Sequence, residues 1–193
     1  MEFIYNETKP VQEIVDAIAF LHGASAMDGF WDGIAQLPTF TQLTDPTCTP
    51  AVISRRMRAC TTPARVVHYT DEASTATAYV TTGDRFVLHM NMKYRRRSEA
   101  SFVNTLAHEF VHVVDCFADV GGRNGSFEYG HSRRHNSERP DSAPYSIGRF
   151  AQHWWTLANQ HVPEQLGVKI FAEPLAEDFL GCDTGSEYPE EGF

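Results

Sequence analysis

The segment from residue 98 to residue 119 most constrains the fold, because it is long, helical in pattern and apolar on nearly every side. Ser98 is suited to cap a helix N-terminus and Glu99 would lie in the first turn, so we expect a helix over about 99–119. Its apolar residues are Phe102, Val103, Leu106, Phe110, Val111, Val113, Val114 and Phe117. A helix that is apolar almost all round is a buried helix. The rest of the chain is therefore expected to pack around it.

Polar side chains interrupt this apolar helix at its centre, where His108, Glu109 and His112 form the pattern His-Glu-x-x-His. Residues four apart lie on one face of an α-helix, so the two imidazoles are placed side by side at a separation that suits one Zn²⁺. Glu109 can then act as a general base toward a metal-activated water. The structural alternative is a pair of core histidines that bond to backbone or carboxylate groups.

Three β-branched or aromatic runs precede the long helix, and the last two flank the turn-forming Thr82-Gly83-Asp84. Such runs are typical of strands, and the turn is typical of a β-hairpin. We therefore expect a small, mostly antiparallel sheet, together with further helices where apolar residues recur at helical spacing. The expected strands are 64–69, 75–81, 85–92 and 126–131, and the expected helices are 10–22, 52–58, 144–160 and 173–180.

The chain of 193 residues is long enough for one domain with a hydrophobic core. We expect a single domain over 1–193. An N-terminal helix and an irregular segment would occupy 1–63, and the sheet and the buried helix would occupy 64–131. A helical part and an acidic tail would follow over 132–193.

Charge and composition exclude several classes of partner. The net charge of −9 repels phosphate backbones, so we expect no nucleic-acid partner, and we interpret the basic cluster at 93–97 as solvated loop charge. No apolar run reaches the roughly 18 residues of a membrane helix, and we expect no signal peptide. We expect a protein that is cytoplasmic as synthesised or exported by a leaderless route. Cys48 and Cys60 could form a disulfide, although free thiols are favoured, and the oligomeric state is left open.

A strand, a turn and a helix with His-Glu-x-x-His, over about residues 64–131, resemble the zincin metallopeptidases. The resemblance implies an α+β fold, with a buried active-site helix against the sheet and further helices toward the C-terminus. It also implies a Zn²⁺ ion held by His108 and His112, with Glu109 as the base that hydrolyses peptide bonds. The strand over 85–92 would be a sheet edge that holds an extended substrate by main-chain hydrogen bonds. The substrate would be a polypeptide or the chemically equivalent stem peptide of peptidoglycan.

The position of the third metal ligand distinguishes the zincin subfamilies. Metzincins need a glycine and a histidine or aspartate where this chain has Asp115 and Ala118. Aspzincins need an aspartate where this chain has Ser126. Neither subfamily is therefore indicated.

Two downstream residues are the main candidates for the third ligand. The stretch 129–131 (Tyr-Gly-His), followed by Ala-Pro-Tyr at 143–145, resembles small uncharacterised bacterial His-Glu-x-x-His proteins, which implies His131. The stretch 173–179 instead resembles the Glu-x-x-Ala-Glu-x-Phe helix of gluzincins of the anthrax lethal factor type, which implies Glu173. The remaining candidates are Asp119, Glu128 and His135.

Other polar residues near the motif have two interpretations each. Tyr129 and Tyr145 could donate a hydrogen bond to the oxyanion of the reaction, or they could be packed core tyrosines. Asp115 could orient an imidazole, or it could be a buried acid that bonds to a loop amide.

A different class of protein is the main alternative, a non-catalytic binding module stabilised by zinc. Its metal would have four protein ligands and no water, with Cys116 or His135 as the fourth. Glu109 discriminates between the two classes, because a structural site has no use for a base beside its first ligand. Within the catalytic class, an injected effector or toxin would use the same chemistry.

Overall fold

Helix α4, Glu99–Ala118, is the element around which the other elements pack. The computed structural model describes residues 1–41, 43, 45–81, 83–118, 129 and 139–159. The helix predicted over 99–119 is confirmed, and Ser98 caps it, since its Oγ accepts a hydrogen bond from the amide of Ser101 at 3.3 Å. Every residue from Thr105 to Asp115 is buried, as expected for a helix that is apolar on nearly all sides.

Helices make up most of the regular structure in the described residues. Besides α4 they are α1 (Gln12–Ser25), α2 (Asp28–Ala35), α3 (Pro50–Ala59) and α5 (Ala143–Asn159), with 3-10 turns η1 (Met92–Tyr94) and η3 (Arg139–Asp141). The predictions of α1, α3 and α5 are confirmed with small changes at their ends. The sequence pattern does not predict α2, because eight residues are too few for a clear periodicity. The predicted strand 126–131 and helix 173–180 lie outside the described residues.

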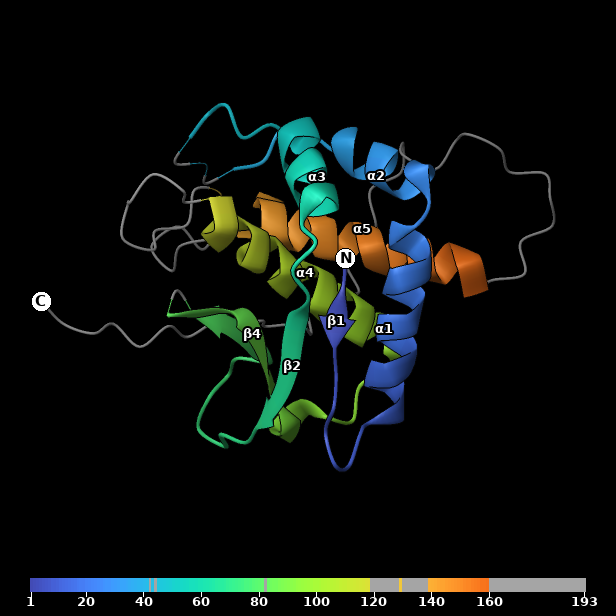
Figure 1. Cartoon of the computed structure of the whole chain (residues 1–193), viewed down its shortest axis with the longest axis vertical. Coiled ribbons are helices and arrows are strands. Elements are labelled where there is room, and N and C mark those ends of the chain that lie inside the picture. The colour runs from blue at the N-terminus through green and yellow to red at the C-terminus, as the bar shows by residue number, and fades with distance from the viewer. Residues whose placement is uncertain (42, 44, 82, 119–128, 130–138, 160–193) are drawn as a thin grey trace, which may run out of the picture.

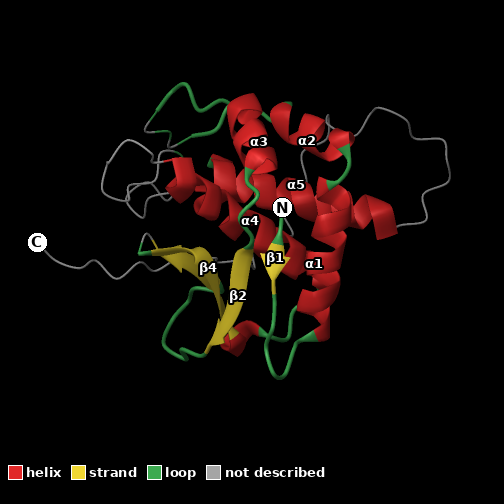
Figure 2. Ribbon diagram, in the orientation of Figure 1, coloured by secondary structure: helices red, strands yellow, loops and turns green. Residues whose placement is uncertain are grey.

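A mixed four-stranded sheet packs on this helical part, in the order β1-β2-β4-β3. Its strands are β1 (Phe3–Ile4), β2 (Ala64–Tyr69), β3 (Ala78–Thr81) and β4 (Asp84–Asn91). Pairing is parallel between β1 and β2 and between β2 and β4, and it is antiparallel between β3 and β4. The α+β class is confirmed, and the strands lie together below α4 and beside α1 (Figure 2).

Two sequence predictions about this sheet are wrong. The sheet is not mostly antiparallel, because three helices separate β1 from β2 and return the chain in the same direction. The strand predicted over 85–92 is not an edge, because β4 pairs with β2 on one side and with β3 on the other. The short strand β3 forms the edge instead, since the hairpin places it on the side of β4 that faces away from β2.

The described elements share one hydrophobic core, with α4 in its middle (Figure 1). Helix α4 packs against α1, α3 and α5, and also against β3 and β4. Cys48 and Cys60 are both buried, and they are not bridged to each other by a disulfide. In the parts of the chain that the structure describes, no helix is both long and apolar enough to cross a membrane.

Candidate metal centre

His108, Glu109 and His112 lie in the middle of α4 and are fully buried, with 0% of each residue exposed. The ring centroids of the two histidines are 5.2 Å apart, and the ring planes make an angle of 63°. This follows from the spacing of four residues, which brings both imidazoles to one face of the helix. The helix therefore presents two nitrogen donors side by side, inside the protein.

The carboxyl group of Glu109, the residue after His108, is also buried. Neither of its oxygens has a hydrogen-bond partner among the described residues. Burial raises the pKa of the Glu109 carboxyl to about 8, because the charged form loses its hydration. A cation bound next to it would favour the charged carboxylate.

Helix α5 runs antiparallel to α4 and covers its histidine-bearing part. The contacts between α4 and α5 follow one another in opposite order along the two helices. They are Trp155 Nε1 to Glu99 Oε1 at 2.6 Å, Asn104 Nδ2 to Gln152 Oε1 at 2.7 Å, and the rings of Tyr145 and His108 at 4.7 Å. The last contact is edge-to-face, with an interplanar angle of 86°. The half-buried Tyr145 is thus brought directly beside the first imidazole.

Gly148 allows α5 to approach α4 this closely. A Cβ atom at this position would lie 2.6 Å from Asn104 Oδ1, 3.0 Å from the carbonyl oxygen of Asn104 and 3.3 Å from His108 Cβ. Neither Gly148 nor Asn104 is predicted from the sequence. A glycine inside a helical stretch is a signal for such close packing, although it does not identify the partner helix.

Asp115 and Tyr129 join α4 to the chain that follows it. The amide of Tyr129 donates a hydrogen bond to Asp115 Oδ2 at 3.2 Å, so Asp115 is a buried acid bonded to a main-chain amide. The Tyr129 side chain is fully buried in the core, and the guanidinium carbon of Arg56 lies 5.9 Å from its ring centroid. Burial and the nearby Asp115 carboxylate raise the pKa of Tyr129 well above its usual value. This tyrosine is therefore placed in the core beside α3 and α4.

Two histidines outside the motif, His22 and His68, have structural contacts. His22 Nε2 accepts a hydrogen bond from the amide of Phe3 at 3.0 Å, and His68 Nε2 lies 2.7 Å from the Tyr5 hydroxyl. Both contacts join the N-terminal strand and the turn after it to their neighbours. These histidines are far from the motif in sequence, and nothing in their contacts indicates a metal.

The candidates for the third ligand, which are His131, Glu173, Asp119, Glu128 and His135, lie outside the described residues. Within the described part, no group of three or more His, Cys, Asp or Glu side chains is arranged to hold a metal ion. The two imidazole nitrogens are donors that zinc prefers, and neither buried Glu109 oxygen has a hydrogen-bond partner among the described residues, so these residues fit a zinc site with a water molecule beside Glu109.

No family model, no curated protein and no solved structure matches this chain. The function of the chain is therefore inferred from the residues of the site and from their geometry.

Proposed function

We propose that the chain is a zinc-dependent metallohydrolase that cleaves amide bonds in polypeptides. The observation that carries the proposal is the burial of three polar residues together on α4. His108 and His112 lie side by side with 0% exposure, and the adjacent Glu109 carboxyl has no partner among the described residues. An uncompensated buried polar group is unfavourable, so a fold that retains one has a use for it.

The metal would be held by His108, His112 and a third residue, for which we propose His131, with Glu173 as the alternative. The placement of Tyr129 supports His131. The Tyr129 amide is bonded to Asp115, three residues beyond His112 on α4. His131 is two residues from Tyr129, and two residues of chain span at most about 7 Å. A histidine at this position is therefore within reach of the same part of the helix.

When bound, zinc would lower the pKa of a water molecule and polarise the carbonyl of the scissile amide. Glu109 accepts a proton from the attacking water as the C–O bond forms, and it then delivers that proton to the leaving nitrogen as the C–N bond breaks. Tyr145, beside His108 on α5, donates a hydrogen bond to the oxyanion. Tyr129 is less suited to this role, because its side chain is buried in the core.

The substrate would lie along β3, the sheet edge next to β4. An edge strand offers unpaired amide and carbonyl groups to an extended peptide, which gives main-chain recognition without a particular sequence. A stem peptide of peptidoglycan offers the same amide bond, and an injected effector would use the same chemistry. Hydrolysis assays with a polypeptide and with a peptidoglycan stem peptide distinguish the two substrate classes.

The test combines metal analysis with the Glu109→Gln variant. Purified protein is expected to contain about one zinc ion per chain and to lose hydrolysis of a fluorogenic peptide library when a chelator is added. Glu109→Gln is expected to keep its zinc and its fold and to lose about 10²–10⁴-fold in kcat, because it removes the base and no ligand. Glu13→Gln, on the exposed face of α1, is the control and is expected to keep full activity.

Three results would contradict the proposal in different ways. A folded protein that takes up no zinc when zinc is supplied excludes the metalloenzyme. Wild-type hydrolysis by Glu109→Gln excludes Glu109 as the base. A tightly bound zinc with four protein ligands and no hydrolysis identifies the non-catalytic binding module instead.

A further inference from the structure

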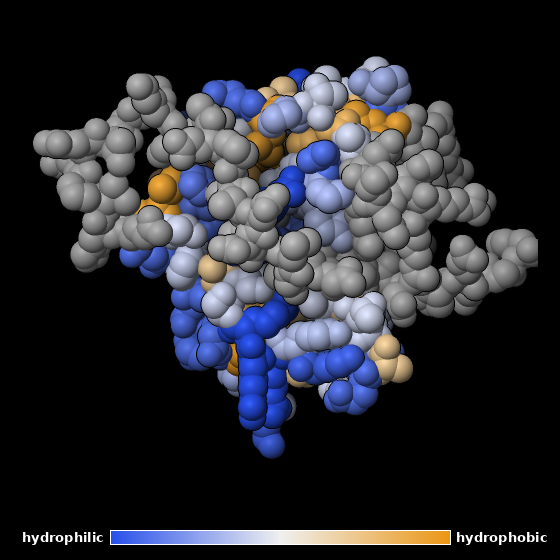
Figure 3. All heavy atoms as spheres, turned by 180° about the vertical axis from the view of Figure 1, so that it is seen from behind, coloured by the Kyte–Doolittle hydropathy of each residue, from blue (hydrophilic) through white to orange (hydrophobic). Residues whose placement is uncertain are grey.

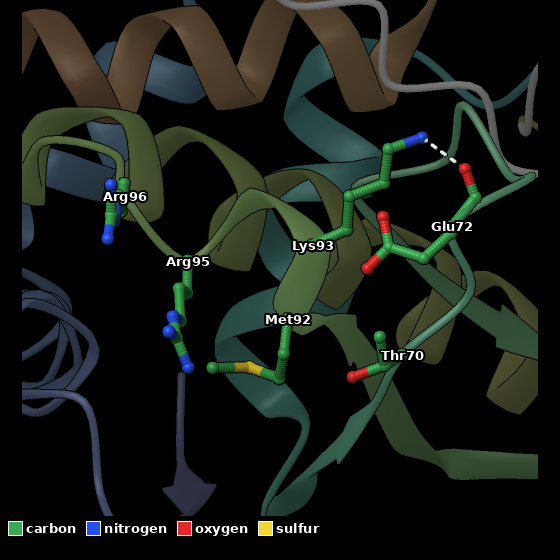
Figure 4. A pocket seen from close by; sticks show the side chains of 6 residues that line it. All are labelled: Thr70, Glu72, Met92, Lys93, Arg95 and Arg96. Atoms are coloured by element: carbon green, nitrogen blue, oxygen red, sulfur yellow. Dashed lines mark hydrogen bonds between the residues drawn. The ribbon is translucent and has the colours of Figure 1, made fainter.

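A pocket of about 420 Å³ lies where the parallel strands β2 and β4 end (Figure 4). Its lining residues come from the chain after β2 and from the turn η1 after β4, and they are Thr70, Glu72, Met92, Lys93, Arg95 and Arg96. Tyr69 and Asn91 are the last residues of the two strands, and they pair with each other. Both strands therefore end at the same edge of the sheet. The carboxyl ends of parallel strands are a common location for ligand sites.

The pocket is positively charged in a chain that is strongly acidic. Three of its lining residues are cationic and one is anionic, whereas the whole chain carries a net charge of −9. The Lys93 ammonium is held in place by the carbonyl oxygens of Glu72 at 2.7 Å and Ser74 at 3.1 Å, both of them neutral acceptors. Lys93 therefore keeps its positive charge at a fixed position beside the pocket.

Arg95 and Arg96 lie on the other side of the pocket from the Lys93 ammonium (Figure 4). Both side chains are exposed, and within the described part of the chain no hydrogen bond or ion pair engages either guanidinium group. On the rear face, the lower end of the molecule, where η1 lies in Figure 1, is hydrophilic (Figure 3). The N-terminus of α4 follows three residues after Arg96, and its partial positive charge adds to the same field.

The pocket is connected to the candidate metal centre by α4 and by the sheet edge. His108 is nine residues from Glu99, the first residue of α4, so it lies about 13–14 Å along the helix. An extended peptide covers this distance in about four residues. The edge strand β3 begins at the same end of the sheet, because Ala78 pairs with Met90, two residues before the pocket residue Met92.

We propose that this pocket binds an acidic side chain of the polypeptide substrate, about four to six residues from the amide bond that is cleaved. The inference rests on the proposed function for its link to cleavage, but not for the binding itself. Arginines recognise carboxylates through paired N–H donors. The Lys93 ammonium adds positive charge and leaves the hydrogen bonds to the carboxylate to the arginines. The enzyme thus selects acidic polypeptide segments, despite its own negative charge.

The test measures binding and cleavage separately in the full-length protein. Fluorescein-labelled peptides with glutamates or with glutamines at the same positions are titrated into zinc-loaded Glu109→Gln protein and followed by anisotropy. The Arg95→Ala/Arg96→Ala variant is expected to weaken binding of the glutamate peptide by about 2- to 30-fold, which corresponds to two exposed ion pairs. In the active enzyme, the same variant is expected to reduce the preference in kcat/KM for the glutamate peptide, mainly through KM.

A matched control removes the same charge elsewhere. Arg55→Ala/Arg65→Ala changes one exposed arginine on α3 and one at the start of β2, the end of this strand away from the pocket, and is expected to leave both measurements unchanged. The proposal is overturned if the two peptides bind equally, or if both double variants weaken binding to the same extent. Tight glutamate-dependent binding without cleavage would instead support the pocket and contradict the proposed function.

Discussion

Gly148→Ala is expected to destabilise the protein, because Gly148 sets the distance between α5 and the histidine-bearing helix. The added methyl group would lie 2.6 Å from Asn104 Oδ1 and 3.0 Å from the carbonyl oxygen of the same residue. The Asn104 side chain cannot move away freely, because its amide is bonded to Gln152 at 2.7 Å. The carbonyl belongs to the backbone of α4, so α5 must shift away from His108.

The expected magnitude is the difference between two opposing effects. Inserting an extra methyl group into a packed interior costs about 1–3 kcal/mol. Replacing glycine by alanine inside a helix stabilises by about 0.5–1 kcal/mol. A net loss of about 1–2 kcal/mol remains, and it lowers the melting temperature by about 2–8 °C in a chain of this size. Because His108 Cβ is 3.3 Å from the new atom, zinc affinity is expected to fall as well.

Thermal unfolding followed by circular dichroism, with and without zinc, measures the effect. Gly23→Ala is the matched control, since a Cβ there has nothing within 4 Å in the exposed last turn of α1. It is expected to raise the melting temperature by about 1–4 °C. A Gly148→Ala protein that is as stable as wild type, or that gains as much as Gly23→Ala, would refute the close approach of the two helices.

Two further predictions concern pH and the metal. Burial lowers the pKa of His22 and His68 below 6.5 in the folded state. The contribution of these two histidines to stability is therefore fully present above pH 6.5, and it is lost as pH falls from 6.5 through their lower pKa values in the folded state. Urea unfolding of chelated protein at pH 7 and pH 5 is expected to show this loss, and an equal loss in the His22→Gln/His68→Gln variant would contradict it. His131→Ala is expected to lower zinc affinity by more than the roughly 10–100-fold typical of a residue that only supports a ligand. Zinc titration of Glu173→Ala is expected to give the wild-type affinity, and the opposite pair of results would identify Glu173 as the ligand.

Much of the site can be predicted from the sequence, because its signals are local. The Ser98 cap and the apolar residues after it define α4, and the spacing of His108 and His112 places both rings on one face. These features depend on helical geometry within a few turns. The same applies to β2, whose alternating and β-branched residues predict its bounds correctly as Ala64–Tyr69.

The sequence by itself therefore determined the buried helix, its pair of imidazoles and the acid between them, since each depends on residues that are near in the chain. Only the tertiary structure decided which strands pair, which strand forms the sheet edge and which helix covers His108. Tyr145 reaches His108 across 37 positions of chain because Gly148 leaves room for α5 against Asn104. The pocket at η1 likewise joins residues after β2 to residues after β4. Such contacts result from the burial of many side chains at once, and no short stretch of sequence contains that information.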